Sequence, residues 1–206
     1  MSKVVIQGNA SGTGNFTIAA PNSNTDRTFN LPDAAGTVLT TGNQSDFPAG
    51  SVLQVAQTQK TDTFSVTGTT WTDITGYSVN ITASSSSNKI LIMADMSIGT
   101  NNYFAYVRLL RGSTPIHVGD TAGSRPLVTA TQSWYAGTTY DVYGLSQSSI
   151  QWLDSPATTS QITYKFQMRH YVAGYSGYLN RTSADRDNAN YEPRTASTIT
   201  VMEIAG

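Results

Sequence analysis

Apolar and polar residues alternate with a period of two along several stretches of this chain. In QITYKFQMRHYV (161–172), every second residue from Ile162 to His170 belongs to an apolar or aromatic series, and polar residues lie between them. This alternation predicts a strand with one buried face. In KILIMADMSIG (89–99), every second residue from Ile90 to Ile98 is apolar and lies on one face. Leu91 and Met93 make the opposite face apolar as well. A strand of this kind is expected at the centre of a sandwich or at a subunit contact.

The remainder of the chain after Ser51 continues this pattern, with Gly, Asn and Ser between the apolar runs. Further strands are predicted at 52–59, 62–66, 69–74, 77–82, 103–112, 115–120, 126–137, 138–145, 149–155 and 197–206. No window longer than two helical turns shows a stripe with the 3.6-residue period of a helix. Short strands at regular spacing predict an all-β, antiparallel jelly-roll sandwich over residues 48–206.

Residues 1–47 have a different organisation. Four short strands are predicted at 4–7, 15–19, 27–31 and 36–41, each with only two or three apolar side chains. A module of this size, without metal or disulfide, is too small to be stable alone. We therefore expect residues 1–47 to form an N-terminal β module that trimerises or packs against a larger partner, with a linker at 46–50.

The composition supports strands and turns and limits the classes of partner. Thr, Ser, Gly and Asn occupy 83 of 206 positions, but 10% aromatic residues and a net charge of −1 are not typical of disorder. The basic residues are scattered, which argues against nucleic acid. Cysteine is absent, so neither a disulfide framework nor a thiolate zinc site is expected. With neither a signal-peptide core nor an apolar span, we expect synthesis in a cytoplasm and no membrane insertion.

The sequence contains no enzyme signature. His117 and His170 lie in apolar strand patterns, where hydrogen-bonded core or interface histidines are expected; one histidine on a trimer axis holding an ion is the minor alternative. Asp154 and Glu192 are candidate glycosidase carboxylates, but nothing in their spacing selects them as a pair. The segment 185–190 resembles a calcium loop but has Ala189 where the third ligand belongs. We expect no catalytic residue, no metal and no cofactor.

Aromatic residues gather in the C-terminal third. One group comprises Trp134, Tyr135, Tyr140 and Tyr143, and the other comprises Tyr175, Tyr178 and Tyr191. Trp134, like Tyr164, lies in a strand pattern that favours the core, whereas 174–194 is typical of a long exposed hairpin or loop. Tyrosine beside polar residues can stack on a sugar ring while its neighbours bind the hydroxyl groups. The predicted receptor-binding residues are therefore Tyr175, Tyr178, Arg181, Asp185, Asn190 and Tyr191.

Several runs resemble the distal jelly roll of short phage fibre proteins, particularly those of cyanophages and marine phages. These runs are TTWTDITGYSVNIT (69–82), SSSSNKILIMADMSI (84–98), FAYVRLLRGSTPIHVGD (104–120) and STITVMEIAG (197–206). The segment 14–42, with its L-P-x-x-x-G-T-V-L core, is similar to one that recurs in phage fibres. The resemblance implies a homotrimer in the virion, attached to other virion proteins through residues 1–47. It also implies candidate binding of a host surface polysaccharide through the jelly roll.

Only one fibre-like segment precedes the predicted jelly roll, and a separate tail-locking domain is not recognisable. The interpretation is therefore a short trimeric tail fibre, with a capsid decoration protein, cement protein or head fibre as the alternative. A secreted carbohydrate-binding or C1q-like module is disfavoured by the absent signal sequence. A polysaccharide hydrolase would require the release of reducing sugar from a host envelope.

Overall fold

The computed structural model describes residues 10–15, 17–19, 22–28, 30, 33, 35–36, 47–134 and 141–206. Residues 1–38 and 39–206 form two separate units. The described residues of the first unit are exposed and none lies in a strand, including those within the expected strands 15–19 and 27–31. The expected strand 4–7 lies outside the described residues, as does 36–41 apart from Gly36. The division into a 1–47 module and a 48–206 domain stays a prediction.

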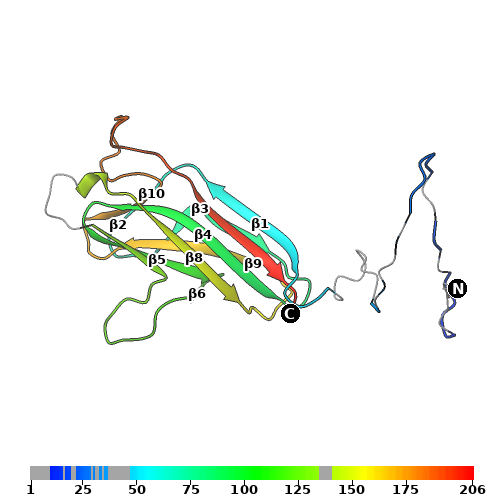
Figure 1. The fold of residues 1–206 in the computed structure, drawn as a ribbon. Coiled ribbons are helices and arrows are strands. Elements are labelled where there is room, and N and C mark those ends of the chain that lie inside the picture. The colour runs from blue at the N-terminus through cyan, green and yellow to red at the C-terminus, as the bar shows by residue number, and fades with distance from the viewer. Residues whose placement is uncertain are drawn as a thin grey trace. The chain divides into compact units, whose positions relative to one another are not determined.

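The second unit consists of two antiparallel sheets (Figure 1). In the first sheet, four strands lie side by side in the order β1 (Val52–Lys60), β11 (Ser197–Ile204), β4 (Lys89–Thr100) and β8 (Ser146–Asp154). Beyond the end of β11, β4 pairs with β10 (Ser176–Leu179), which in turn pairs with β2 (Phe64–Thr67).

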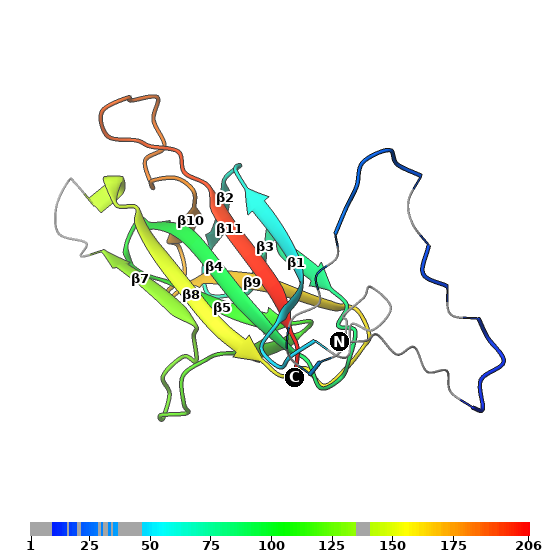
Figure 2. The same cartoon turned by 45° about the vertical axis from the view of Figure 1, so that its right-hand side comes forward.

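The second sheet is built around β5. Its strands follow the order β3 (Thr72–Ile81), β9 (Ile162–His170) and β5 (Tyr103–Arg111), with β7 (Ala130–Trp134) and β6 (Thr114–Ile116) sharing the far edge of β5. The chain passes repeatedly from one sheet to the other, so that a six-stranded and a five-stranded sheet form the two layers (Figure 2). This arrangement is an antiparallel jelly-roll sandwich, which confirms the predicted fold class.

The core lies between the facing sides of the two sheets. The alternating residues of 162–170 are all buried, and Tyr164, Phe166 and Met168 are fully enclosed. The series Ile90 to Ile98 faces them from β4 and is equally buried. These two strands therefore have the period-two faces that their sequences predicted, because each pairs on both edges and has one side against the opposite sheet.

Several strand predictions differ from the structure. The predicted strands 69–74 and 77–82 are one strand, β3, with a register shift between Asp73 and Ser78 and a positive φ of 75° at Gly76. Residues 141–143 form a 3-10 turn, η2, and not the expected strand, and the Tyr143 ring in this turn contacts that of Tyr191 from a distant segment. The predicted strand 115–120 ends at Ile116.

A buried carboxylate joins the ends of three segments near the C terminus. Glu203 is 1% exposed. Its Oε1 accepts hydrogen bonds from the Ser84 amide (2.6 Å), the Ser84 hydroxyl (2.7 Å) and Asn88 Nδ2 (2.6 Å). Gln54 donates to the other oxygen. Burial raises the pKa of Glu203, but the hydrogen bonds outweigh burial and hold it below its ordinary 4.5.

Glu203→Gln is expected to lower the free energy of unfolding by about 1–3 kcal/mol at pH 7, because an amide group then faces several donors. The stabilisation by Glu203 is present above pH 4.5 and is lost as the pH falls through the lowered pKa of the folded state. The difference between wild type and variant should therefore shrink on acidification. Urea unfolding between pH 7 and pH 3 measures it; a difference that does not change with pH would contradict this prediction.

Candidate binding site in the 180–196 loop

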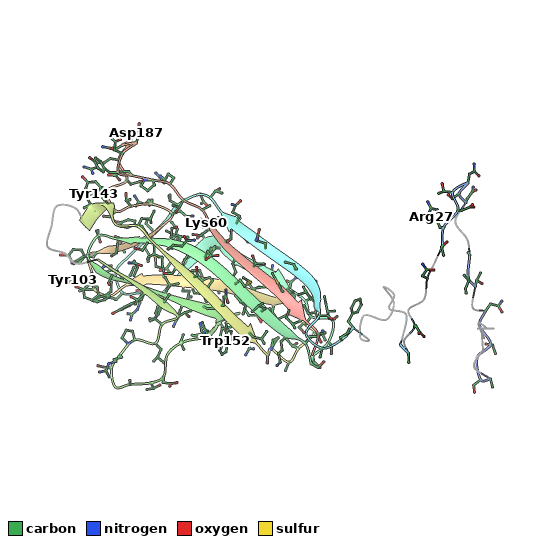
Figure 3. All side chains as sticks on the ribbon, in the orientation of Figure 1. Arg27, Lys60, Tyr103, Tyr143, Trp152 and Asp187 are labelled. Carbon is green, nitrogen blue, oxygen red and sulfur yellow. The ribbon has the colours of Figure 1, made fainter. Side chains whose placement is uncertain are left out.

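The sandwich has two distinct ends. At one end the Gly50 amide donates to the Ala205 carbonyl (2.8 Å), so the chain enters the sandwich beside the point where it leaves it. Tyr103, Tyr143 and Asp187 lie at the other end (Figure 3). We call this other end the loop end, because it contains the connection from β10 to β11 (residues 180–196).

Asn180 holds the base of this loop. It is fully buried and adopts a positive φ of 62°, which asparagine tolerates better than most residues. Its Nδ2 donates to the carbonyl oxygens of Lys60 (2.8 Å) and Asp62 (3.0 Å), and its Oδ1 accepts from the Ser197 hydroxyl (2.6 Å). One side chain therefore joins the turn after β1 to both ends of the loop.

The loop then lies against the outer face of the first sheet at Gly99. A Cβ atom at this position would come within 2.6 Å of the Arg181 carbonyl oxygen and 3.1 Å of that of Gly144. Only glycine permits so close an approach of two backbones. Arg181 in turn covers Tyr178, with its guanidinium carbon 4.3 Å from the centre of the tyrosine ring.

Glu192 organises the middle of the loop. Its side chain is 2% exposed. Its carboxylate accepts hydrogen bonds from the Thr182 hydroxyl (2.6 Å), the Arg186 amide (3.0 Å) and Arg186 Nε (2.7 Å). The hydrogen bond from Thr182 is the largest influence, and together with those from Arg186 it lowers the pKa of Glu192. The loop is thus folded around an ionised carboxylate.

Two ion pairs and an aromatic contact complete the surface. Asp185 pairs with Arg181 (2.8 Å) and with Arg194 (2.6 Å). The Tyr191 ring lies 5.5 Å from the Tyr143 ring, which also has Arg186 over its face at 5.0 Å. The same loop has an open, mainly polar depression of about 390 Å³, lined by Asp185, Arg186, Asp187, Asn188, Ala189, Glu192 and Arg194. Such a surface can offer guanidinium and amide donors beside an exposed tyrosine.

The structure distributes the six predicted receptor-binding residues unevenly. Asn190 and Tyr191 are exposed in the loop, and Tyr191 is 58% exposed. Arg181 and Asp185 lie beside them as a mutual ion pair that is largely enclosed. Tyr175 is exposed but belongs to a different cluster, since its ring lies 5.7 Å from that of His170.

Tyr178 departs from the expectation of one long exposed loop. Residues 176–179 form β10, and Tyr178 is buried beneath Arg181. The sequence of β10 is short and contains a glycine, so no alternation marks it as a strand. The organising roles of Glu192 and Asn180 were also not predicted. The only sequence feature that could have indicated these roles is a carboxylate or amide side chain in a segment rich in residues that can donate hydrogen bonds to it.

The residues considered for other chemistry have structural partners. His170 is buried, with Nε2 2.7 Å from the Asn102 carbonyl oxygen and Nδ1 3.0 Å from that of Val172. His117 stacks on Trp152, with ring centres 4.7 Å apart. Asp154, the last residue of β8, accepts two hydrogen bonds from Arg111 and one from Tyr164. β8 ends on the side of the sandwich away from the connection between β10 and β11, to which Glu192 belongs (Figure 1). These two carboxylates are therefore not a pair.

Metal-ligating clusters and membrane-spanning helices are both absent from the described part of the chain. No group of three or more metal-ligating side chains occurs among residues 47–134 and 141–206 or the described positions before them. Within the same residues, no helix has the length and apolar character required to cross a membrane.

No protein-family model matches the sequence, and no curated protein matches it significantly. Solved structures with some similarity include that of infectious bursal disease virus strain Gx, at 15% identity and a TM-score of 0.37, covering 82% of this chain and 44% of the other. T=1 particles derived from the same virus align at 13% identity and a TM-score of 0.37, covering 82% and 40%. The VP2 subviral particle of that virus aligns at 15% identity and a TM-score of 0.30, covering 74% and 38%.

This chain spans less than half the length of these three solved chains. At these scores the similarity does not identify a function.

Proposed function

We propose that this protein is a non-catalytic structural component of a bacteriophage virion, namely a short homotrimeric tail fibre that binds a host surface glycan. The observation that carries the proposal is the difference between the two ends of the sandwich. The chain enters beside Ala205, whereas Tyr191, Asn190 and the open depression lie at the loop end. Residues 1–47 would contact other virion proteins from the entry side and leave the loop end free for recognition. Loops on a rigid sandwich are frequent recognition sites.

The homotrimer is supported by the outer face of the first sheet. A row of apolar residues crosses four strands in register: Val55 on β1, Met202 on β11, Leu91 on β4 and Leu153 on β8. Val55 is 57% exposed and Leu153 is 45% exposed. An apolar row across a sheet is typical of a surface that is covered in an assembly. In the proposed homotrimer, a second and a third copy of this chain cover this apolar row.

Tyr191→Ala combined with Asn190→Ala, carried in the virion, is expected to reduce the adsorption rate to host cells by about tenfold or more, because exposed tyrosines often dominate binding energy. The matched control is Leu127→Ala, an exposed apolar residue outside the loop. Both virions should contain the same amount of this protein, and both purified chains should unfold at the wild-type temperature.

Unchanged adsorption of the Tyr191 and Asn190 variant would contradict receptor binding by this loop. A decoration or cement protein gives a different result. Its copy number would follow the capsid lattice, and its removal would weaken the particle and leave adsorption intact.

A further inference from the structure

A second cluster of aromatic and cationic side chains lies on the outer face of the other sheet, also at the loop end. On β5, Ala105 and Val107 point into the core, so the alternating residues Phe104, Tyr106 and Arg108 face outward. On β9, Met168 and His170 are buried and Arg169 lies between them on the outer side. We call the set Trp71, Phe104, Tyr106, Arg108, Arg169 and Tyr171 the Trp71 patch.

The rings and guanidinium groups of the Trp71 patch form a continuous series. The guanidinium carbons of Arg108 and Arg169 lie 4.4 and 5.0 Å from the centre of the Trp71 ring. Arg169 is also 5.3 Å from the Tyr106 ring. The Tyr106 ring stacks on that of Phe104 at 6.1 Å, and Tyr171 meets Phe104 edge-on at 5.8 Å. Two cations are thereby held against a wall of exposed or half-buried rings.

The charge of this region is positive in a chain of net charge −1. Its ionised groups are Arg108, Arg169 and Lys165, against the single carboxylate of Asp73, which gives a net charge of +2 (3 − 1). Asp73 is bound to Lys165 and to Gln167, both at 2.7 Å, and not to either arginine. Burial, followed by repulsion from Arg169, lowers the pKa of Arg108. Arg108 donates from Nε and Nη2 to the neutral Gln167 Oε1 (2.8 and 2.6 Å), so neither guanidinium charge on this indole ring is balanced by a bonded carboxylate, and a bound anion would be favourable.

The guanidinium group of Arg169 does not use all of its hydrogen-bond donors. Its Nη1 donates to the Thr69 carbonyl at 3.3 Å, while its buried Nε has no hydrogen-bond partner within the described residues. An unsatisfied buried guanidinium donor is unfavourable, and because this Nε is enclosed, an acceptor from another molecule reaches it only after the Arg169 side chain shifts. Carboxylate and sulfate groups suit the planar donors of arginine. The rings of Phe104 and Tyr106 are flat apolar surfaces on which a sugar ring can lie.

We propose that the Trp71 patch binds an anionic saccharide whose rings carry carboxylate or sulfate groups. The anionic group lies against Arg169 and Arg108, and the apolar face of a sugar ring lies on Phe104 and Tyr106. The patch carries too few cations, and too short a row of them, for a nucleic acid backbone. This site is distinct from the 180–196 loop and does not depend on a role in adsorption or on a place in the tail.

The test is calorimetric titration of the full-length chain with three probes: oligogalacturonate, a sulfated maltooligosaccharide and the uncharged maltooligosaccharide. We expect at least one anionic probe to bind, more weakly as salt concentration rises, and the uncharged probe not to bind. Binding of oligogalacturonate alone assigns the ligand as a uronate, and binding of the sulfated probe alone assigns it as a sulfate ester.

Arg169→Gln and Phe104→Ala should each weaken the binding by about tenfold or more, because they remove the charged donor and the stacking ring separately. The control is Arg125→Gln, which removes the same charge from an exposed loop outside the patch and should leave the affinity unchanged. If Arg169→Gln does not fold, Arg108→Gln takes its place. Absence of binding, equal binding of the uncharged probe, or equal weakening by Arg125→Gln would overturn the proposal.

Discussion

Asn180→Ala is expected to lower the free energy of unfolding by about 4 kcal/mol or more. The change leaves the Lys60 and Asp62 carbonyl oxygens and the Ser197 hydroxyl without their amide partner in a buried position. Each unsatisfied group of this kind costs roughly 1–3 kcal/mol. Alanine at a φ of 62° adds about 1–2 kcal/mol of backbone strain.

Urea unfolding of three variants separates these contributions. Asn180→Gly removes the same hydrogen bonds but tolerates the positive φ, so it should be more stable than Asn180→Ala by about 1 kcal/mol. Asn190→Ala is the matched control, because it makes the same chemical change at an exposed position and should alter stability by less than about 0.5 kcal/mol. If Asn180→Ala and Asn190→Ala were equally stable, Asn180 would not be the anchor of the loop.

Leu153→Glu is expected to convert the proposed trimer into monomers. Leu153 is the edge member of the apolar row formed with Leu91, Met202 and Val55, and it is 45% exposed in the single chain. A carboxylate is well hydrated there in the monomer but loses its water in the trimer, and an unpaired buried charge costs several kcal/mol. Three symmetry-related copies would multiply this cost. Native mass spectrometry of wild type and variant measures the change.

Leu127→Glu is the matched control, since Leu127 is a similarly exposed leucine outside the row, and it should leave the assembly intact. Circular dichroism should show the same strand content for both variants. A wild-type monomer would contradict the trimer itself. A Leu153→Glu variant that remains trimeric would show that trimerisation depends on another surface, such as residues 1–47.

Sequence patterning was most informative in the long central strands. The strands at 89–100 and 162–170 pair on both edges and face the opposite sheet, so burial imposes a period of two on nearly every residue. Such a pattern is local and can be read without knowing the partner strand. Leu91 and Met93 also made β4 apolar on its outer side, for which the sequence left two explanations open: a central place in the sandwich or a subunit contact.

The candidate sites were less predictable because their residues come from distant segments. Tyr191 meets Tyr143 of η2, and Trp71 meets Arg108 and Arg169 of two other strands. These partners lie far apart in the sequence, so no repeating pattern of residues indicates that they meet. Each contact results from the strand order and the register of the sheets. Tyr178 illustrates the converse case. Its sequence context was that of an exposed loop, but the structure buries it in β10, which pairs with β4, and the guanidinium of Arg181 covers its ring.

The amino-acid sequence by itself therefore determined the all-β sandwich, because alternating burial and turn residues are written into each strand separately. The tertiary structure decided which aromatic and charged side chains share a surface. It left Asn190 and Tyr191 exposed in the loop with Tyr191 against Tyr143, and it brought Trp71 to two arginines on the other sheet. The physical reason is that strand periodicity is a local property, whereas a binding surface depends on contacts that form only when the sheets have closed.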